Sequence, residues 1–397
     1  MMLASIDWVA WILLFARVIV IFALLLVAVL LTIWIERKVV ADMQVRVGPN
    51  RAGPFGILIT LADGIKLFFK EGITPSSADR PVYMIAPLAS VVPAMLAFAV
   101  IPFGTGVFIF GHHVPFQITD LNVGVLWVVA MASLSVYGIV LAGWSSGSNY
   151  PLLGAIRSTA QLISYEVGMG LGLVAVLLYS GTLTMSEIVA TQARHFHVTG
   201  LGWLPKWNIF LQFPAFLIYM TAALAEINRP PFDLPEAETE LVAGYHTEYS
   251  GIKFAMFYLA EYMHAITISA VAVTLFLGGW HGPMFHVVRW LWPLLWFLVK
   301  LFAAIFVLVW IRATLPRFRY DRLMNLGWKV LIPVGLLWIL VTAAYVELPK
   351  VYPPWRAALI IVAGVVAVLA MVGPLFVGPP RAAEAAGPGA PVESSHR

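Results

Sequence analysis

The sequence contains no cysteine and few charged residues. Without thiolates, the chain by itself holds no iron–sulfur cluster, no thiolate zinc site and no disulfide. Only 11% of its residues are charged, whereas 61% are hydrophobic, and a soluble core does not hide so many apolar side chains from water. The net charge is only +4, and the basic residues lie close to apolar runs. This pattern favours contacts with lipid head groups over binding of nucleic acid.

Long apolar runs indicate an all-α, polytopic bundle of transmembrane helices. About 20 apolar residues are needed to cross the hydrocarbon of a bilayer. Nine runs meet this length, at about residues 9–35, 81–103, 123–145, 161–181, 209–227, 252–279, 292–314, 329–347 and 355–377. We expect one transmembrane domain over residues 1–377, followed by a disordered tail over residues 378–397, which is rich in Pro, Gly and Ala.

The distribution of Lys and Arg predicts the orientation in the membrane. Most of these residues fall in alternate loops on one side of the predicted spans, and such loops are normally cytoplasmic. The N-terminus is therefore expected outside. The first apolar run has no basic segment and no small-residue cleavage site before it, so we expect a retained span and not a removed signal peptide.

The first cytoplasmic loop contains an amphipathic segment at residues 57–70, between Gly56 and Gly72. Its apolar residues share one helical face and its charged residues share the other, which is typical of a helix in the membrane interface. Two interpretations remain open. The helix either braces the bundle, or it forms a lip over an opening through which a lipid-soluble molecule enters from the bilayer.

Three acidic residues, Glu166, Glu226 and Glu261, lie within or at the ends of predicted spans. Ionisable residues at membrane depth are costly and usually functional. In a low-dielectric site an unpaired carboxylate tends to hold a proton. Each acid could simply pair with a basic or tyrosine side chain between helices. Three of them on neighbouring helices favour a proton relay.

The loop at residues 225–251 concentrates acidic residues against a single basic residue, Arg229. Pro230, Pro231 and Pro235 exclude a continuous helix. A short helix that begins at Pro235 would explain two of the acids by ordinary helix-start preference. It would not explain all six acids of this loop, which are Glu226, Asp233, Glu236, Glu238, Glu240 and Glu248. Clustered carboxylates repel, so their proton occupancy is expected to be coupled.

Basic residues gather at residues 35–54, where they could bind lipid phosphates, pair with the acidic loop or face a polar quinone head. Gly-Pro pairs in this segment predict tight turns. The nine histidines show no metal-ligand spacing, and we assign no metal site.

Four motifs carry a resemblance: IERKVVADMQVRVGPNRAGPFG, GWSSGSNYPLLGAIRSTAQLISYEV, AEINRPPFDLPEAETELVAGYHTEYSG and AEYMHAI. In this order they closely resemble the NuoH family, a membrane component of the proton-pumping NADH:quinone oxidoreductase, respiratory complex I. The likeness covers residues 9–346. It implies a non-redox subunit of the membrane arm in a bacterial cell membrane, with its main loops cytoplasmic and no catalysis alone. Its partners would be other membrane-arm subunits, peripheral subunits at the quinone site, and membrane lipids.

The resemblance also implies roles for individual residues. Quinone would be the substrate, this chain would bind no cofactor alone, and FMN and iron–sulfur clusters would lie on partner subunits. The expected quinone access path and chamber comprise Glu36, Arg37, Arg46, Arg51, Asp63, Lys66 and Phe232. The expected proton-coupling residues are Glu166, Glu226, Asp233, Glu236, Glu238, Glu240, Tyr245, Glu248 and Glu261. The third span lacks the carboxylate that some members have, so a water or Tyr137 would have to bridge it.

Other functions remain open at this point. Membrane-bound hydrogenases and related dehydrogenases use a homologous anchor subunit. A stand-alone transporter is less favoured because no pair of repeats with broken helices is visible, and a purely structural anchor is a further alternative. No residue selects the quinone, for which we favour menaquinone.

Overall fold

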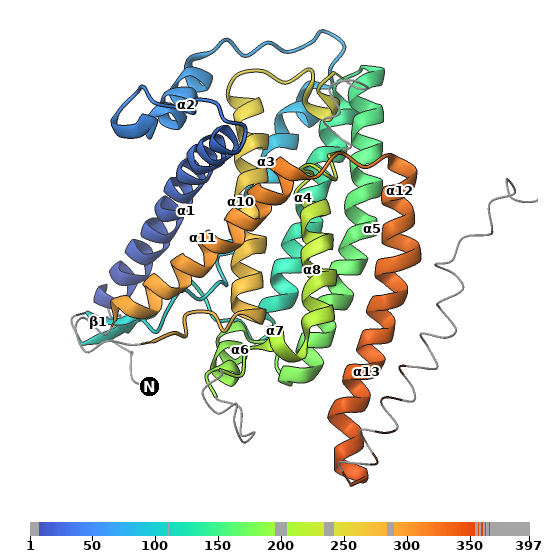
Figure 1. Cartoon of the computed structure of the whole chain (residues 1–397). Coiled ribbons are helices and arrows are strands. Elements are labelled where there is room, and N and C mark those ends of the chain that lie inside the picture. Colours follow the sequence, from blue (N-terminus) through green and yellow to red (C-terminus); the bar gives the residue numbers. More distant parts are fainter. Residues whose placement is uncertain are drawn as a thin grey trace, which may run out of the picture. The chain divides into compact units, whose positions relative to one another are not determined.

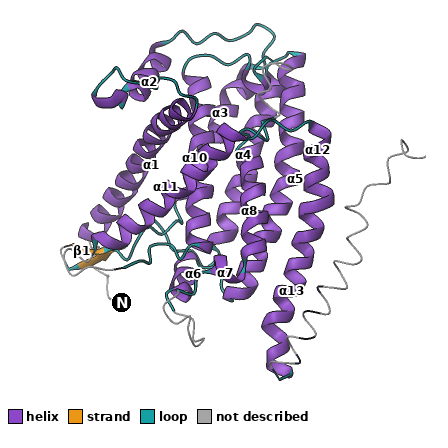
Figure 2. Cartoon of the chain, in the orientation of Figure 1, coloured by secondary structure: helices purple, strands orange, loops and turns teal. Residues whose placement is uncertain are grey.

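The computed structural model describes residues 8–353 except 110, 195–204, 234–241 and 284–289, and also residues 356, 359, 362 and 365. The chain divides into two compact units, Met1–Ile339 and Leu340–Arg397. The described part is mostly helical and contains almost no sheet, as Figure 2 shows, which confirms the predicted all-α bundle. The predicted tail at 378–397 and nearly all of the predicted ninth span lie outside the described residues.

Seven helical segments of the described part are long and apolar enough to cross a membrane. They are α1 (Trp8–Met43), α3 (Arg80–Phe98), α4 (Gly124–Ser145), α5 (Asn149–Ser180), α10 (Ile252–Phe276), α11 (Leu291–Thr314) and the run Tyr320–Val351. The last run combines α12 (Tyr320–Asn325), a π-helical stretch (Leu326–Leu331) and α13 (Ile332–Val351). Seven of the predicted spans thus coincide with long helices, although α5 begins well before the predicted residue 161.

The predicted fifth span, 209–227, is not one continuous helix. It is divided at Gln212 into α7 (Asn208–Leu211) and α8 (Phe213–Glu226), and Pro214 lies in the first turn of α8, where proline is tolerated. Fourteen residues of helix span only about 21 Å, less than the roughly 30 Å of a hydrocarbon core. The chain after α8 stays inside the bundle, since Pro231, Phe232 and Asp233 are buried.

The shorter elements connect the long helices. They comprise η1 (Pro54–Gly56), α2 (Ile59–Phe69), α6 (Met185–Gln192), η2 (Gly244–His246) and an antiparallel hairpin of β1 (Val107–Ile109) with β2 (His112–Val114). Figure 1 shows α2 and the hairpin at opposite ends of α1. The predicted helix at 57–70 is confirmed with slightly narrower bounds, and its apolar residues Leu61, Ile65 and Phe68 are exposed.

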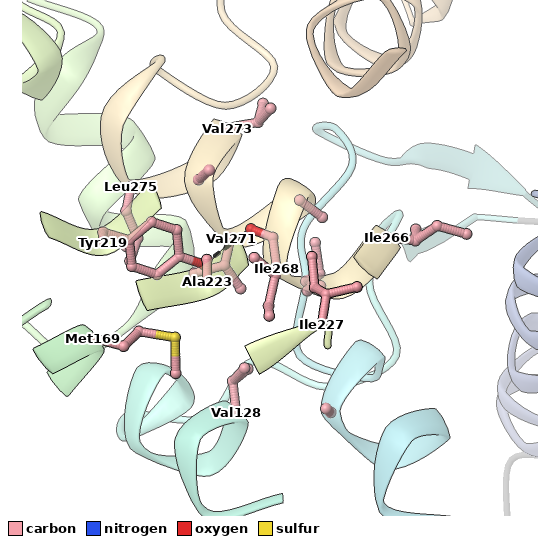
Figure 3. Close-up of a cluster of buried hydrophobic side chains, with 14 of the residues drawn as sticks. Val128, Met169, Tyr219, Ala223, Ile227, Ile266, Ile268, Val271, Val273 and Leu275 are labelled. Atoms are coloured by element: carbon pink, nitrogen blue, oxygen red, sulfur yellow. Dashed lines mark hydrogen bonds between the residues drawn. The ribbon is translucent and has the colours of Figure 1, made fainter. Parts of the chain in front are cut away.

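The core of the first unit lies where α4, α5, α8 and α10 meet. Figure 3 shows Val128 of α4, Met169 of α5 and Tyr219 of α8 directed towards Ile268 and Val271 of α10. The Tyr219 hydroxyl donates to the carbonyl of Ile268 at 2.9 Å. This contact ties α8 to α10 and fixes the register in which Glu226, at the end of α8, faces α10.

Glycine permits close approach at the helix pairs beside this core. A Cβ at Gly143 of α4 would lie 2.2 Å from the Ala155 Cβ of α5, and one at Gly172 would lie 3.0 Å from the Ala215 carbonyl oxygen at the start of α8. Gly172 thus lets α5 approach α8 closely, whereas an added Cβ at Gly170 would meet nothing within 4 Å.

Candidate functional site

A cavity of about 590 Å³ opens between α1, α2 and α10. We call it the side cavity. Apolar residues of α1 and α10 line most of it, and Arg37, Asp63 and Lys66 supply its charged groups. The Arg37 Nη1 lies 2.7 Å from the Asp63 Oδ2, which ties the C-terminal part of α1 to α2. Both side chains are partly exposed, so the pair positions α2 more than it stabilises the fold.

A second cavity, of about 560 Å³, lies beside the first. We call it the basic cavity because Arg37, Arg46 and Arg312 line it together with Glu36, Tyr258 and Tyr262. Arg37 and Tyr258 line both cavities, so the two are neighbours that share a wall. One apolar-lined space therefore adjoins one that is lined by cations and phenolic hydroxyls.

Five of the seven predicted chamber residues line one or both of these cavities: Glu36, Arg37, Arg46, Asp63 and Lys66. Arg51 is exposed in the loop after α1. Phe232 is 4% exposed and packs against Tyr165 and Phe318. The structure thus places Phe232 in an aromatic core contact.

A network of buried charges separates the basic cavity from the interior. Glu36 forms an ion pair with Arg312 of α11, and its other oxygen accepts a 2.6 Å hydrogen bond from the Tyr262 hydroxyl. Arg229 lies with Nη1 3.8 Å from Glu36 Oε1 and forms an ion pair through Nε with Glu261. Charge therefore alternates along Arg312, Glu36, Arg229 and Glu261, so a change on one group is felt by the next.

Aromatic rings support this network. The Arg229 guanidinium lies 4.5 Å from the centroid of the Tyr262 ring and 5.7 Å from that of Tyr258. Cations are attracted to such ring faces. The two hydroxyls, Tyr258 and Tyr262, lie 3.2 Å apart. A chain of exchangeable hydrogens thus runs from the wall of the two large cavities to Glu36.

A third cavity, of about 50 Å³, lies deeper in the bundle. We call it the inner cavity. Its polar lining includes Glu226, Glu261, His264, Tyr245 and Ser135. A water molecule needs on the order of 10–15 Å³ of such space, so the cavity has room for a few waters. Glu261 lines it and is paired to Arg229, which joins the inner cavity to the charged network.

Glu226 and His264 form the buried pair at this cavity. The His264 Nε2 lies 2.9 Å from the Glu226 Oε1, and the His264 and Glu226 side chains are 12% and 4% exposed, respectively. The pair holds the end of α8 against α10. His264 was not among the residues predicted from sequence, although it lies three positions after Glu261 and therefore on the same helical face.

Glu166 of α5 accepts a hydrogen bond from the Ser133 hydroxyl of α4. It also interacts electrostatically with Glu226 and His264, so the three predicted buried acids belong to one region of the bundle. Tyr137, the alternative bridge proposed for the third span, has a side chain that is 63% exposed. On α4, the Ser133 hydroxyl donates to Glu166, and Ser135 lines the inner cavity together with the apolar Ala132, Val136 and Ile139.

The loop after α8 is held by specific contacts. Gln161 donates from Nε2 to the carbonyls of Ala225 and Phe232, both at 2.7 Å. The Asp233 Oδ2 lies 3.3 Å from the Arg317 Nη2. Glu236, Glu238 and Glu240 lie outside the described residues, and so does the short helix predicted to begin at Pro235.

The far end of the same loop packs against α3 and α4. Tyr249 stacks on Tyr83 with ring centroids 4.1 Å apart, and the Tyr83 hydroxyl donates to the Glu248 carbonyl at 2.7 Å. Burial, helped by the nearby Tyr83, raises the pKa of Tyr249 to about 12 despite a hydrogen bond with Ser145. Both ends of the acidic loop are therefore fixed to the bundle.

Compared with known protein families, residues 16–343 match the family described as NADH dehydrogenase.

Proposed function

This chain belongs to the NADH dehydrogenase family as a membrane subunit of that multi-subunit complex, and we propose that it forms the quinone access path and part of the quinone chamber and couples quinone reduction to proton translocation. The complex acts as an oxidoreductase. The proposal places the chain in a bacterial cell membrane with its main loops cytoplasmic. We assign FMN and the iron–sulfur clusters to partner subunits, and the absence of cysteine excludes a cluster held by thiolates of this chain alone.

The observation that carries the proposal is the shared lining of the cavities. The side cavity has apolar walls suited to an isoprenoid tail, and its neighbour has arginine and tyrosine groups suited to the polar head of a quinone. A lipid-soluble substrate needs such a change from apolar to polar surroundings. Exposed apolar residues of α2 beside the side cavity, such as Phe68 and Phe69, fit contact with the bilayer.

The coupling step rests on the alternating charges. Reduction of a quinone consumes protons and changes the charge near Glu36 and Arg312. Glu36 interacts with Arg229, which pairs with Glu261 at the inner cavity. Because neighbouring charges determine how readily each carboxylate holds a proton, the change at the chamber is transmitted to Glu226 and Glu166.

A direct test of the access path fills the side cavity without removing any charge. Gly64 of α2 lines this cavity, and a Cβ there would meet nothing within 4 Å. Gly64→Leu should raise the apparent KM for a long-tailed quinone several-fold. NADH oxidation by an artificial acceptor that takes electrons from the peripheral arm should not change.

Gly72→Leu provides the matched control, because Gly72 also has open space around an added Cβ and lies in the loop beyond α2. An equal effect of both variants, or none from Gly64→Leu, argues against access through the side cavity. The coupling role is tested by Glu226→Gln in membranes with the complex assembled. Unchanged quinone reduction and proton pumping would refute it.

A further inference from the structure

His264 lies among the buried acidic residues of the bundle. It is on α10 three residues after Glu261, and both side chains line the inner cavity. Its Nε2 lies 2.9 Å from the Glu226 Oε1. The simple interpretation is a buried histidine that holds α8 against α10. Three further observations favour a larger role.

First, α4 carries no acidic residue along its whole length. Its polar groups towards Glu166 and the inner cavity are the hydroxyls of Ser133 and Ser135. Hydroxyls and waters relay protons, but they do not store one at neutral pH. Histidine is the side chain whose proton exchange falls in the physiological range.

Second, His264 interacts with acids on two other helices. It contacts Glu226 of α8 directly and interacts electrostatically with Glu166 of α5. Third, Glu226 Oε2 and His264 Nδ1 are buried and have no hydrogen-bond partner among the described residues. Buried polar atoms are nearly always hydrogen-bonded, so each of these two atoms is suited to bond a water of the inner cavity.

We propose that His264 itself carries protons between Glu226 and Glu166, across the part of the path where α4 supplies no acid. This inference rests on the proton-coupling function proposed above. The remaining titratable or charged groups at the inner cavity are Glu261 on the same helix, with its partner Arg229, and Tyr245 of η2.

The proposed proton transfer from Glu226 to Glu166 takes place in two steps. A proton moves from Glu226 Oε1 to His264 Nε2, so that an O–H bond breaks and an N–H bond forms. The products are a carboxylate and an imidazolium, and the charge of the pair as a whole is unchanged. The imidazolium then releases its Nδ1 proton to a cavity water, which passes a proton on to Glu166. Exchange with cavity water, in which Nδ1 takes up a proton as Nε2 gives one up, restores the starting Nδ1–H tautomer.

The test compares His264→Asn with the matched control His113→Asn in the assembled complex. Asparagine can still hydrogen-bond to Glu226 but does not titrate, and His113 is exposed on the hairpin between α3 and α4. Because a positioned proton carrier usually contributes 10²–10⁴-fold and waters replace part of it, we expect quinone reduction coupled to pumping to fall about tenfold or more. The rate with an artificial acceptor and the His113→Asn rates should stay at the wild-type level.

Two further measurements distinguish a carrier from a structural contact. The pH profile of coupled turnover should lose its histidine-dependent limb in His264→Asn, and added imidazole should restore part of the rate in His264→Gly. If His264→Asn does not assemble, His264→Gln serves in its place, since its longer amide reaches the same Glu226 oxygen.

The outcomes separate the two proposals. Wild-type turnover, pumping and pH profile in His264→Asn, alongside inactive Glu226→Gln, overturn the role of His264 and leave the coupling function intact. A loss of rate in His264→Asn that imidazole does not relieve in His264→Gly, with an unchanged pH profile, assigns His264 a structural role and also overturns the inference. Full activity in Glu226→Gln removes the coupling function and the inference with it.

Discussion

Replacing Arg229 by methionine tests how strongly the charged network is coupled. The Arg229 side chain is 12% exposed, pairs with Glu261, and lies 3.8 Å from Glu36. With an effective dielectric constant of about 20, two unit charges at that distance attract each other by roughly 4 kcal/mol. The desolvation of both partners offsets much of this attraction. Removing one partner of a buried pair nevertheless costs about 3–5 kcal/mol, because the other charge stays buried.

The structure predicts which carboxylate bears this cost. Glu36 keeps its ion pair with Arg312 and its hydrogen bond from Tyr262, whereas Glu261 loses the ion pair with Arg229. Arg229→Met should therefore lower the stability of the subunit by about 3 kcal/mol or more. Adding Glu261→Gln should recover most of that loss, since no buried charge then remains unbalanced.

The assay is a double-mutant cycle on the assembled complex, read as midpoints of thermal inactivation for the two single variants and the double variant. Contacting residues in one network show coupling of about 0.5–3 kcal/mol, and we expect the upper end of that range here. Additive effects of the two substitutions, within about 0.5 kcal/mol, would refute the assignment of Arg229 as the partner that balances Glu261.

Three further predictions concern the scaffold. Lys300 Nζ donates to three backbone carbonyls just after α10 at 2.6–2.9 Å and so caps the end of that helix. Lys300→Met should therefore lower thermal stability by about 2–3 kcal/mol and raise proteolysis at residues 277–283, measured by mass spectrometry. No change in either measurement would contradict this capping role. Gly143→Val should prevent assembly, seen on native gels, since its side chain would collide with Ala155, and normal assembly would show that α4 and α5 can separate. The pKa of Tyr249 is raised to about 12 in the folded chain, whereas the unfolded chain loses this proton above about pH 10, so stability should fall between pH 10 and 12. Tyr249→Phe should make the midpoint of thermal inactivation fall less steeply over that range. An unchanged slope would show that Tyr249 is not the group responsible.

Some of the site could be predicted from the sequence because it depends on local pattern. Apolar runs long enough for a bilayer predicted the spans, and the spacing of apolar residues at 57–70 predicted α2. Acids within apolar runs are rare enough to be noticed one by one, which identified Glu166, Glu226 and Glu261. Each of these signals is contained within a few helical turns of the chain.

Other features depend on contacts between distant residues. Arg312 follows Glu36 by hundreds of positions, and only the packing of α1 against α11 makes them a pair. The sequence pattern did not identify His264 as a site residue, because a single histidine in an apolar helix is usually a core residue. Its role depends on the contact with Glu226, which lies on another helix.

The break of the fifth span at Gln212 is another feature that the apolar pattern did not predict. The run at 209–227 is apolar enough to suggest one helix, yet α8 begins only at Phe213. It ends early enough for Pro231, Phe232 and Asp233 to be buried inside the bundle. Hydropathy measures how a segment partitions into the bilayer, and it does not measure where the segment stops being helical.

The sequence alone determined that this chain is a helical membrane protein with no thiolate ligand for an iron–sulfur cluster, because composition and apolar length are local properties that do not depend on partners. The tertiary structure decided which charges balance one another and where space remains for a substrate or for water. Those properties arise from side chains on different helices, and a linear pattern does not record which helices become neighbours.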